Sequence, residues 1–161
     1  MNRTETSDSQ GFLASILGYA DSLAARAGDT VLLVGRFAMG IIFFQSGAAK
    51  LVALNAFSAS LASRGVPFPE FWGPVGASSE FVGGTMIILG LGTRYAACLI
   101  VIFVIVATAI SHRYWEISEP AMGRLQQVQF FKNLAIVGGT LFLFICGAGR
   151  FSLDAVLVKK R

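Results

Sequence analysis

Four long apolar segments constrain the fold of this chain more than any other feature of its sequence. They cover residues 31–54, 74–92, 95–111 and 130–147. Each is close to the roughly 20 residues that an α-helix needs to cross a hydrocarbon core about 30 Å thick. Because the apolar residues form continuous blocks and do not alternate with polar ones, the pattern predicts spanning helices and not a lipid-facing β-barrel.

The charge content agrees with this interpretation. Only 14% of the 161 residues are charged, against roughly 25% in typical soluble domains. So few charges cannot cover a surface that faces water on all sides, and the sequence therefore predicts an all-α integral membrane protein, a four-helix up-and-down bundle. The net charge of +4 lies mostly in the tail, residues 156–161, which suits contact with anionic membrane lipid and argues against nucleic-acid binding.

The connections between segments predict the topology. The link at residues 92–94 is so short that the helices it joins must be antiparallel neighbours. An even number of crossings puts both termini on one side, which carries seven Lys and Arg residues against five on the other, so the positive-inside rule favours cytoplasmic termini. The longer links at 55–73 and 113–129 hold aromatic residues typical of a membrane interface, and Pro67 and Pro69 forbid a regular helix around them.

Residues 1–29 precede the membrane domain, which we expect to span residues 30–155. The acidic residues Glu5, Asp8 and Asp21 break the pattern of a signal peptide. Apolar residues then recur at helical spacing, namely Phe12, Ile16, Ala20 and Leu23. The leader is therefore predicted either as an amphipathic helix on the inner membrane surface or as a frayed polar extension.

The informative residues are polar ones inside or at the ends of the apolar segments, because a charge at mid-bilayer costs about 2.5–3.5 kcal/mol on insertion scales. They are Arg36, Gln45, Lys50, Glu80, His112, Lys132 and Asn133. Alternating helix directions bring six of them toward the same, outer end of the bundle, with Arg36 at the opposite end. In the first helix, one stripe at helical spacing is predicted to face protein, comprising Arg36, Gly40, Phe43, Gly47 and Lys50. Gln45 lies about half a turn away from Arg36 and faces another neighbour or the interface.

Two interpretations of these residues stay open. In the first they form a polar pocket, with Glu80 and His112 as candidate catalytic residues that accept or relay a proton. Lys50, Lys132, Asn133 and Gln45 would then contact a carbonyl-bearing ligand such as a quinone. In the second, Glu80 pairs with Lys50 or Lys132 only to hold the bundle together, while His112 caps its helix. Docking of a partner protein is a third possibility.

The sequence offers little support for a cofactor held by this chain. One histidine and two cysteines do not support a zinc site or bis-histidine haem ligation. Cys98 and Cys146 are not in a C-x-x-C arrangement and are expected to act as small apolar packing residues. Small-residue helix faces permit a homo-oligomer, although they also serve packing within one bundle.

Several short motifs, in order, resemble the DoxX family over about residues 30–155. They are Gly35-Arg36-Phe37, Gly47 to Leu51, Gly65-Val66-Pro67, Glu80 to Gly84, Gly90 to Arg94, His112, Phe131 to Leu134, and Gly147 to Asp154. The resemblance implies a four-helix protein of the bacterial inner membrane. Its relatives include a membrane subunit of thiosulfate:quinone oxidoreductase, and members are often described as oxidoreductases. The positions that match are Arg36, Lys50, Glu80, His112, Lys132 and Asn133.

We therefore expect a redox-associated or quinone-interacting membrane component that works with a redox partner protein and holds no redox centre of its own. Whether the chain is itself an enzyme is left open. The alternatives are a non-catalytic assembly or scaffold protein and a proton-coupled carrier of small molecules.

Overall fold

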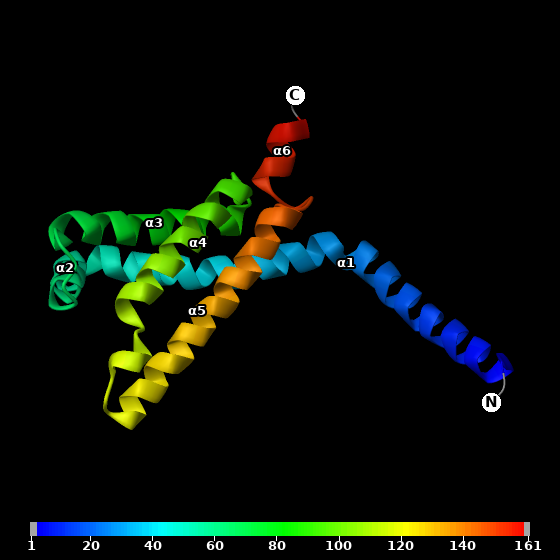
Figure 1. Ribbon diagram of the computed structural model, residues 1–161. Coiled ribbons are helices and arrows are strands. Elements are labelled where there is room, and N and C mark those ends of the chain that lie inside the picture. Colours follow the sequence, from blue (N-terminus) through cyan, green and yellow to red (C-terminus); the bar gives the residue numbers. More distant parts are fainter. Residues whose placement is uncertain (1–2, 160–161) are drawn as a thin grey trace.

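The computed structural model describes residues 3–159, and every regular element in that range is helical. The elements are α1 (Arg3–Val52), α2 (Leu54–Ser63), α3 (Pro69–Leu89), α4 (Thr93–Ser111), the 3₁₀ helix η1 (Tyr114–Glu116), α5 (Pro120–Cys146) and α6 (Leu153–Lys159). The predicted all-α class is confirmed. Figure 1 shows the N-terminal part of α1 extending away from the other helices.

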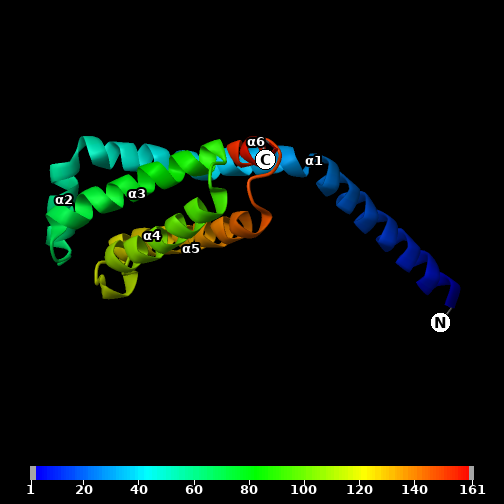
Figure 2. The ribbon, with the colours of Figure 1, turned by 90° about the horizontal axis from the view of Figure 1, so that it is seen from above.

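The long helices form two pairs. Helix α1 packs along α3, and α4 packs along α5, while α3 and α4 also contact each other and are joined by a tight turn. The two pairs diverge from the end where this turn lies, as Figure 1 shows, and Figure 2 shows α1 with α3 on one side and α4 with α5 on the other. Helices α1 and α5 therefore contact each other over only a short stretch, and the arrangement is more open than the compact bundle that we expected.

Glycines allow α1 and α3 to approach closely. A Cβ atom built at Gly47 would lie 2.7 Å from the Cα of Phe81, and one at Gly84 would lie 2.5 Å from the backbone nitrogen of Phe44. Small residues at a helix contact permit this distance because no side chain separates the two backbones. The predicted protein-facing stripe of α1 is confirmed, since Arg36, Gly40, Phe43 and Gly47 are buried and Lys50 is half-buried.

The buried core lies where the pairs meet. It consists of six side chains drawn from α1, α3, α4 and α5, namely Phe43, Ile87, Ala96, Ile100, Val104 and Leu143. Many large apolar side chains remain exposed on the outer faces, for example Ile102, Phe142 and Ile145. Three helical stretches are long and apolar enough to cross a membrane, Gly18–Val52, Thr93–Glu116 and Pro120–Cys146. These features indicate a helical membrane protein.

Helix α3 has 21 residues, but it also carries Glu80 and four glycines, so it is less apolar than the three stretches above. Its first residue is Pro69, a position where the missing N–H costs nothing. The irregular part of the link predicted at 55–73 is therefore confined to residues 64–68, because α2 forms before it and α3 begins directly after it.

All four long helices begin before their apolar segments, and α1 and α5 do so by the largest margins. Helix α5 starts at Pro120, because the Glu119 carboxylate accepts hydrogen bonds from the backbone nitrogens of Ala121 and Met122 and caps it. Helix α1 includes residues 3–29 without interruption, so the leader and the first spanning helix are one element. Whether the leader lies on a membrane surface stays a prediction.

The α1–α3 contact yields a testable prediction. Gly47→Ala should lower the thermal stability of the purified protein, by roughly 1–3 kcal/mol, because the new methyl group forces two backbones apart. Gly138→Ala is the matched control, since no atom lies within 4 Å of a Cβ atom built there. Thermal unfolding of both variants in detergent measures the difference, and equal stabilities would contradict the close contact.

Candidate functional site

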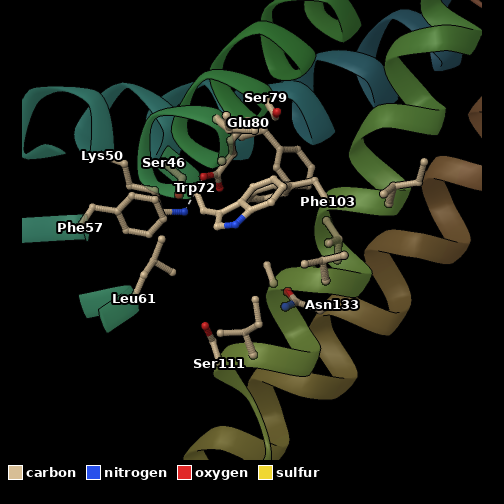
Figure 3. A pocket seen from close by; sticks show the side chains of 18 of the residues that line it. Ser46, Lys50, Phe57, Leu61, Trp72, Ser79, Glu80, Phe103, Ser111 and Asn133 are labelled. Carbon is tan, nitrogen blue, oxygen red and sulfur yellow. Dashed lines mark hydrogen bonds and ion pairs between the residues drawn. The ribbon is translucent and has the colours of Figure 1, made fainter. Parts of the chain in front are cut away.

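A cavity of about 820 Å³ lies between the two helix pairs. Its wall is mostly apolar and includes Phe57, Leu61, Trp72, Phe103 and Ile136. Figure 3 shows side chains of α1, α2 and α3 on one side of this space and side chains of α4 and α5 on the other. The divergence of the pairs thus leaves a partly open cavity of the size usual for a small-molecule site.

Five of the predicted site residues line this one cavity: Lys50, Glu80, His112, Lys132 and Asn133. They come from four different helices or helix ends, as the up-and-down arrangement predicted. The structure therefore brings these five side chains together, although it tests no catalytic or binding role for them.

Lys50 and Glu80 form an ion pair on the cavity wall. The ammonium group of Lys50 donates a hydrogen bond to Oε2 of Glu80, drawn as a dashed line in Figure 3. Glu80 is only 5% exposed, so its charge depends on this partner. The Lys50 nitrogen also lies 5.2 Å from the ring centre of Phe57 and 5.7 Å from that of Phe103. Two aromatic rings thus lie within cation–π distance of the ammonium group.

His112 and Asn133 each contact a polar side chain on the other helix of the α4–α5 pair. Nδ1 of His112 lies 2.7 Å from Oε1 of Gln126, and the amide nitrogen of Asn133 donates to Oγ1 of Thr108 at 2.8 Å. Lys132 donates to Oε1 of Gln129 on its own helix. Of the two partners that the sequence left open for Glu80, the structure selects Lys50.

One further contact joins the helix pairs at the edge of the cavity. Nη1 of Arg64, just after α2, donates to the backbone oxygen of Ser111 at the end of α4, at 3.4 Å. Both residues line the cavity. The guanidinium group therefore spans the two sides of the site at the end where the pairs lie farthest apart.

Gln45 does not join the site. It is exposed on α1 and does not line the cavity, which agrees with its offset from the protein-facing stripe. Its predicted role as a ligand-binding residue therefore has no support from the position that it occupies.

Arg36 lies at the opposite end, as predicted. It is 1% exposed, and its Nη2 donates to the backbone oxygen of Phe151. Its remaining guanidinium nitrogens, Nε and Nη1, make no hydrogen bond within the described chain. A Cβ atom at Gly90 would clash with Nη1, so the backbone there packs directly against the guanidinium group.

Asp154 completes this second polar end. Its carboxylate accepts hydrogen bonds from the backbone nitrogens of Gly92, at 2.6 Å, and Thr93, at 2.9 Å, which open α4. Burial alone would raise the pKa of Asp154, but these two hydrogen bonds and the charge of Arg36 outweigh burial and hold the pKa below its ordinary value. The carboxylate thereby ties α6 to the first turn of α4.

Sequence reasoning missed Gln126, because the fourth helix was expected to start at residue 130. A signal for it exists in the sequence: Gln126, Gln129 and Asn133 are spaced by three and four residues. This spacing places them on one face of a helix that extends toward the N-terminus.

These features define a class: a helical membrane protein with a largely apolar internal cavity that holds an ion pair, a histidine and an amide. The DoxX family model matches residues 31–113, and the model of the SURF4 family matches residues 79–161. The chain belongs to the DoxX family.

Individual relatives agree with this assignment. Inner membrane protein YphA of Escherichia coli is 33% identical over 138 residues, which is 86% of this chain and 96% of that protein. Inner membrane protein YqjF of the same organism is 34% identical over 132 residues, 82% of this chain and 95% of that protein. A surfeit locus protein 4 homolog of Schizosaccharomyces pombe is 33% identical over 70 residues, 43% of this chain and 23% of that protein. No solved structure matches the chain significantly.

The low pKa of Asp154 predicts acid sensitivity. Its contribution to stability is complete above its ordinary pKa of 3.8 and is lost as the pH falls through the lower value that it has in the folded protein. Asp154→Asn should lower stability at neutral pH, by about 0.5–2 kcal/mol as for a lost helix cap, and should flatten the profile below pH 3.8.

Thermal unfolding as a function of pH measures this effect. Asp21→Asn, which neutralises an exposed carboxylate on α1, is the control and should leave the acid profile unchanged. An Asp154→Asn profile that parallels the wild type would contradict the proposed link between α6 and α4.

Proposed function

We propose that the protein is a redox-associated component of the bacterial inner membrane that binds a quinone in the cavity between its helix pairs. The observation that carries this proposal is a largely apolar cavity of about 820 Å³ with a buried Lys50–Glu80 ion pair on its wall. A quinone has a flat apolar ring with carbonyl oxygens at opposite edges. It therefore needs both apolar walls and a few hydrogen-bond donors.

The cavity offers such donors. The ammonium groups of Lys50 and Lys132 each carry three N–H bonds, of which the described chain uses one in each case. Trp72, Phe57 and Phe103 contribute aromatic surface to the same space. This combination suits a carbonyl-bearing aromatic ligand better than a charged or a purely aliphatic one.

The chain can contribute protons to quinone chemistry, while a partner must contribute the electrons. Reduction of a quinone to a quinol consumes electrons and protons in equal numbers. Glu80 and His112 are side chains on the cavity wall that can exchange protons. We infer that a redox partner protein supplies the electrons, so that the protein acts as the membrane component of a pair.

We further propose that α3 crosses the bilayer as well as the three more apolar stretches, which gives four crossings. Its 21 residues suffice for this length, and it packs along α1 and contacts α4. Both termini then lie on the cytoplasmic face, as the distribution of basic residues favours.

A scaffold function is the second candidate, and one observation favours it. The Lys50–Glu80 pair is the contact that a purely structural role for Glu80 requires. In that case the buried charges specify how α1 packs on α3, and the cavity holds no specific ligand.

Three variants separate these candidates. Replacing Lys50 and Glu80 together by Gln should leave stability near that of the wild type, because no uncompensated charge remains. Glu80→Gln alone should cost about 1–3 kcal/mol, because half-buried Lys50 then loses its partner. Lys132→Met should weaken quinone binding by roughly two- to tenfold, because a quinone carbonyl then loses one hydrogen-bond donor. Binding of a short-chain ubiquinone to the purified protein, measured beside thermal unfolding, tests each variant.

The control is Glu116→Gln, which breaks the exposed Arg113–Glu116 pair outside the cavity and should change neither quantity by much. If the double variant and Lys132→Met bind the quinone as the wild type does, the quinone proposal is wrong. Loss of binding only in proportion to loss of stability would favour the scaffold function.

The four-crossing topology predicts which positions a membrane-impermeant maleimide can reach. In a variant with Cys98→Ala and Cys146→Ala, single cysteines at the exposed positions Ser63 and Ser118 should react in intact cells. A cysteine at exposed Arg94 should react only after permeabilisation. If Ser63 and Arg94 react from the same side, α3 does not cross.

A further inference from the structure

The ring of His112 has one nitrogen engaged and one free. Nδ1 lies 2.7 Å from Oε1 of Gln126, while Nε2 makes no hydrogen bond to any residue in the described range 3–159. The ring itself lines the cavity. Nε2 is therefore the nitrogen left for a ligand.

Gln126 determines which ring nitrogen of His112 carries the proton. An amide oxygen only accepts hydrogen bonds, so a neutral His112 must carry its proton on Nδ1 to make this contact. The partner of one ring nitrogen thereby sets the state of the other, and Nε2 becomes an unprotonated acceptor. A free histidine carries its proton mainly on Nε2, so the arrangement reverses the usual preference.

We propose that Gln126 is a positioning residue that holds His112 in the Nδ1-protonated form, so that the cavity selects ligands that present a hydroxyl group. This inference rests on the proposed function, and within it the preferred form is the quinol and not the quinone. A quinol hydroxyl donates to Nε2, whereas a quinone carbonyl has no hydrogen to donate.

Neighbouring contacts support the role of Gln126. Asn133 is on the same helix face and already donates to Thr108, and Lys132 already binds Gln129. Gln126 is half-buried, so water competes less for its amide oxygen than on an exposed face. His112 and Gln126 come from the end of α4 and from the part of α5 that precedes the apolar segment, so their contact fixes the ring at the cavity edge.

The chain contains a single histidine, which permits a direct experiment. Nuclear magnetic resonance on purified protein labelled with ¹⁵N-histidine gives one set of ring signals, all from His112. At a pH where these signals show a neutral ring, the wild type should have a protonated Nδ1 and an unprotonated Nε2. Gln126→Leu should shift the ring toward the Nε2-protonated form, and Gln126→Glu, which keeps an acceptor oxygen, should retain the wild-type form.

Binding measurements supply the second readout, with a short-chain ubiquinone and its quinol as probes. The wild type should bind the quinol more tightly than the quinone by roughly two- to tenfold, the effect of one hydrogen bond. Gln126→Leu should bring this ratio close to one. Gln127→Leu, which changes the exposed neighbour, is the matched control and should keep both the ring form and the ratio.

The two readouts separate the failure of this inference from the failure of the proposed function. A wild-type ring protonated on Nε2, or a Gln126→Leu ring identical to the wild type, would overturn the role of Gln126 even if both probes bind. Binding of neither probe would contradict the quinone function and with it the selectivity for hydroxyl groups. The ring signals would then still decide how Gln126 acts on His112.

Discussion

The rest of the structure depends on the close contact between α1 and α3. Gly47 and Gly84 let the two backbones approach to a distance that no side chain would permit. Lys50 is three residues after Gly47, and Glu80 is four residues before Gly84, so the same contact aligns the two charges. The ion pair is therefore a consequence of backbone packing. The cavity has its charged wall because glycines, and not larger residues, occupy the contact.

The cavity itself follows from an asymmetry between the helix contacts. Helix α3 contacts both α1 and α4, but α1 and α5 meet over only a short stretch. The short turn at Gly90–Gly92, whose end glycines both have positive φ, holds α3 and α4 together at one end, and Asp154 fastens α6 to the same place. With that end closed, the helix pairs diverge toward the other, and α2 with its cavity-lining Phe57 and Leu61 lies beside the opening. The helix pairs are thus joined at the α3–α4 turn and separated by the cavity at the opposite end.

Much of the fold and of the site could be predicted from the sequence, for definite physical reasons. Apolar blocks reveal spanning helices because lipid excludes polar side chains, and alternating helix directions then give the depth of each polar residue. Lys50, Glu80, His112, Lys132 and Asn133 were placed together in this way. An amphipathic helix was one of two predictions for the leader, but its continuity with the first spanning helix was not predicted. The early start of α5 was missed because its first turns are polar and do not extend the apolar block. Gln45 shows a further limit, since depth alone does not tell which way a side chain faces. The divergence of the helix pairs depends on side-chain volumes at contacts between distant segments, and a periodic pattern does not encode them.

The two polar ends differ in whether their charged groups border a cavity. At the Arg36 end, Gly90 packs against the guanidinium group, and the Asp154 carboxylate is occupied by backbone nitrogens. The backbone thus contacts both charges directly, and their contacts join the C-terminal segment to α1 and to the start of α4. At the Glu80 end, the ion pair borders a cavity, and Nε2 of His112 has no partner within residues 3–159. A buried ion pair adds little net stability compared with apolar residues of the same volume. Stability alone therefore does not explain why charges lie beside an open space, whereas the ligand recognition proposed above would explain it.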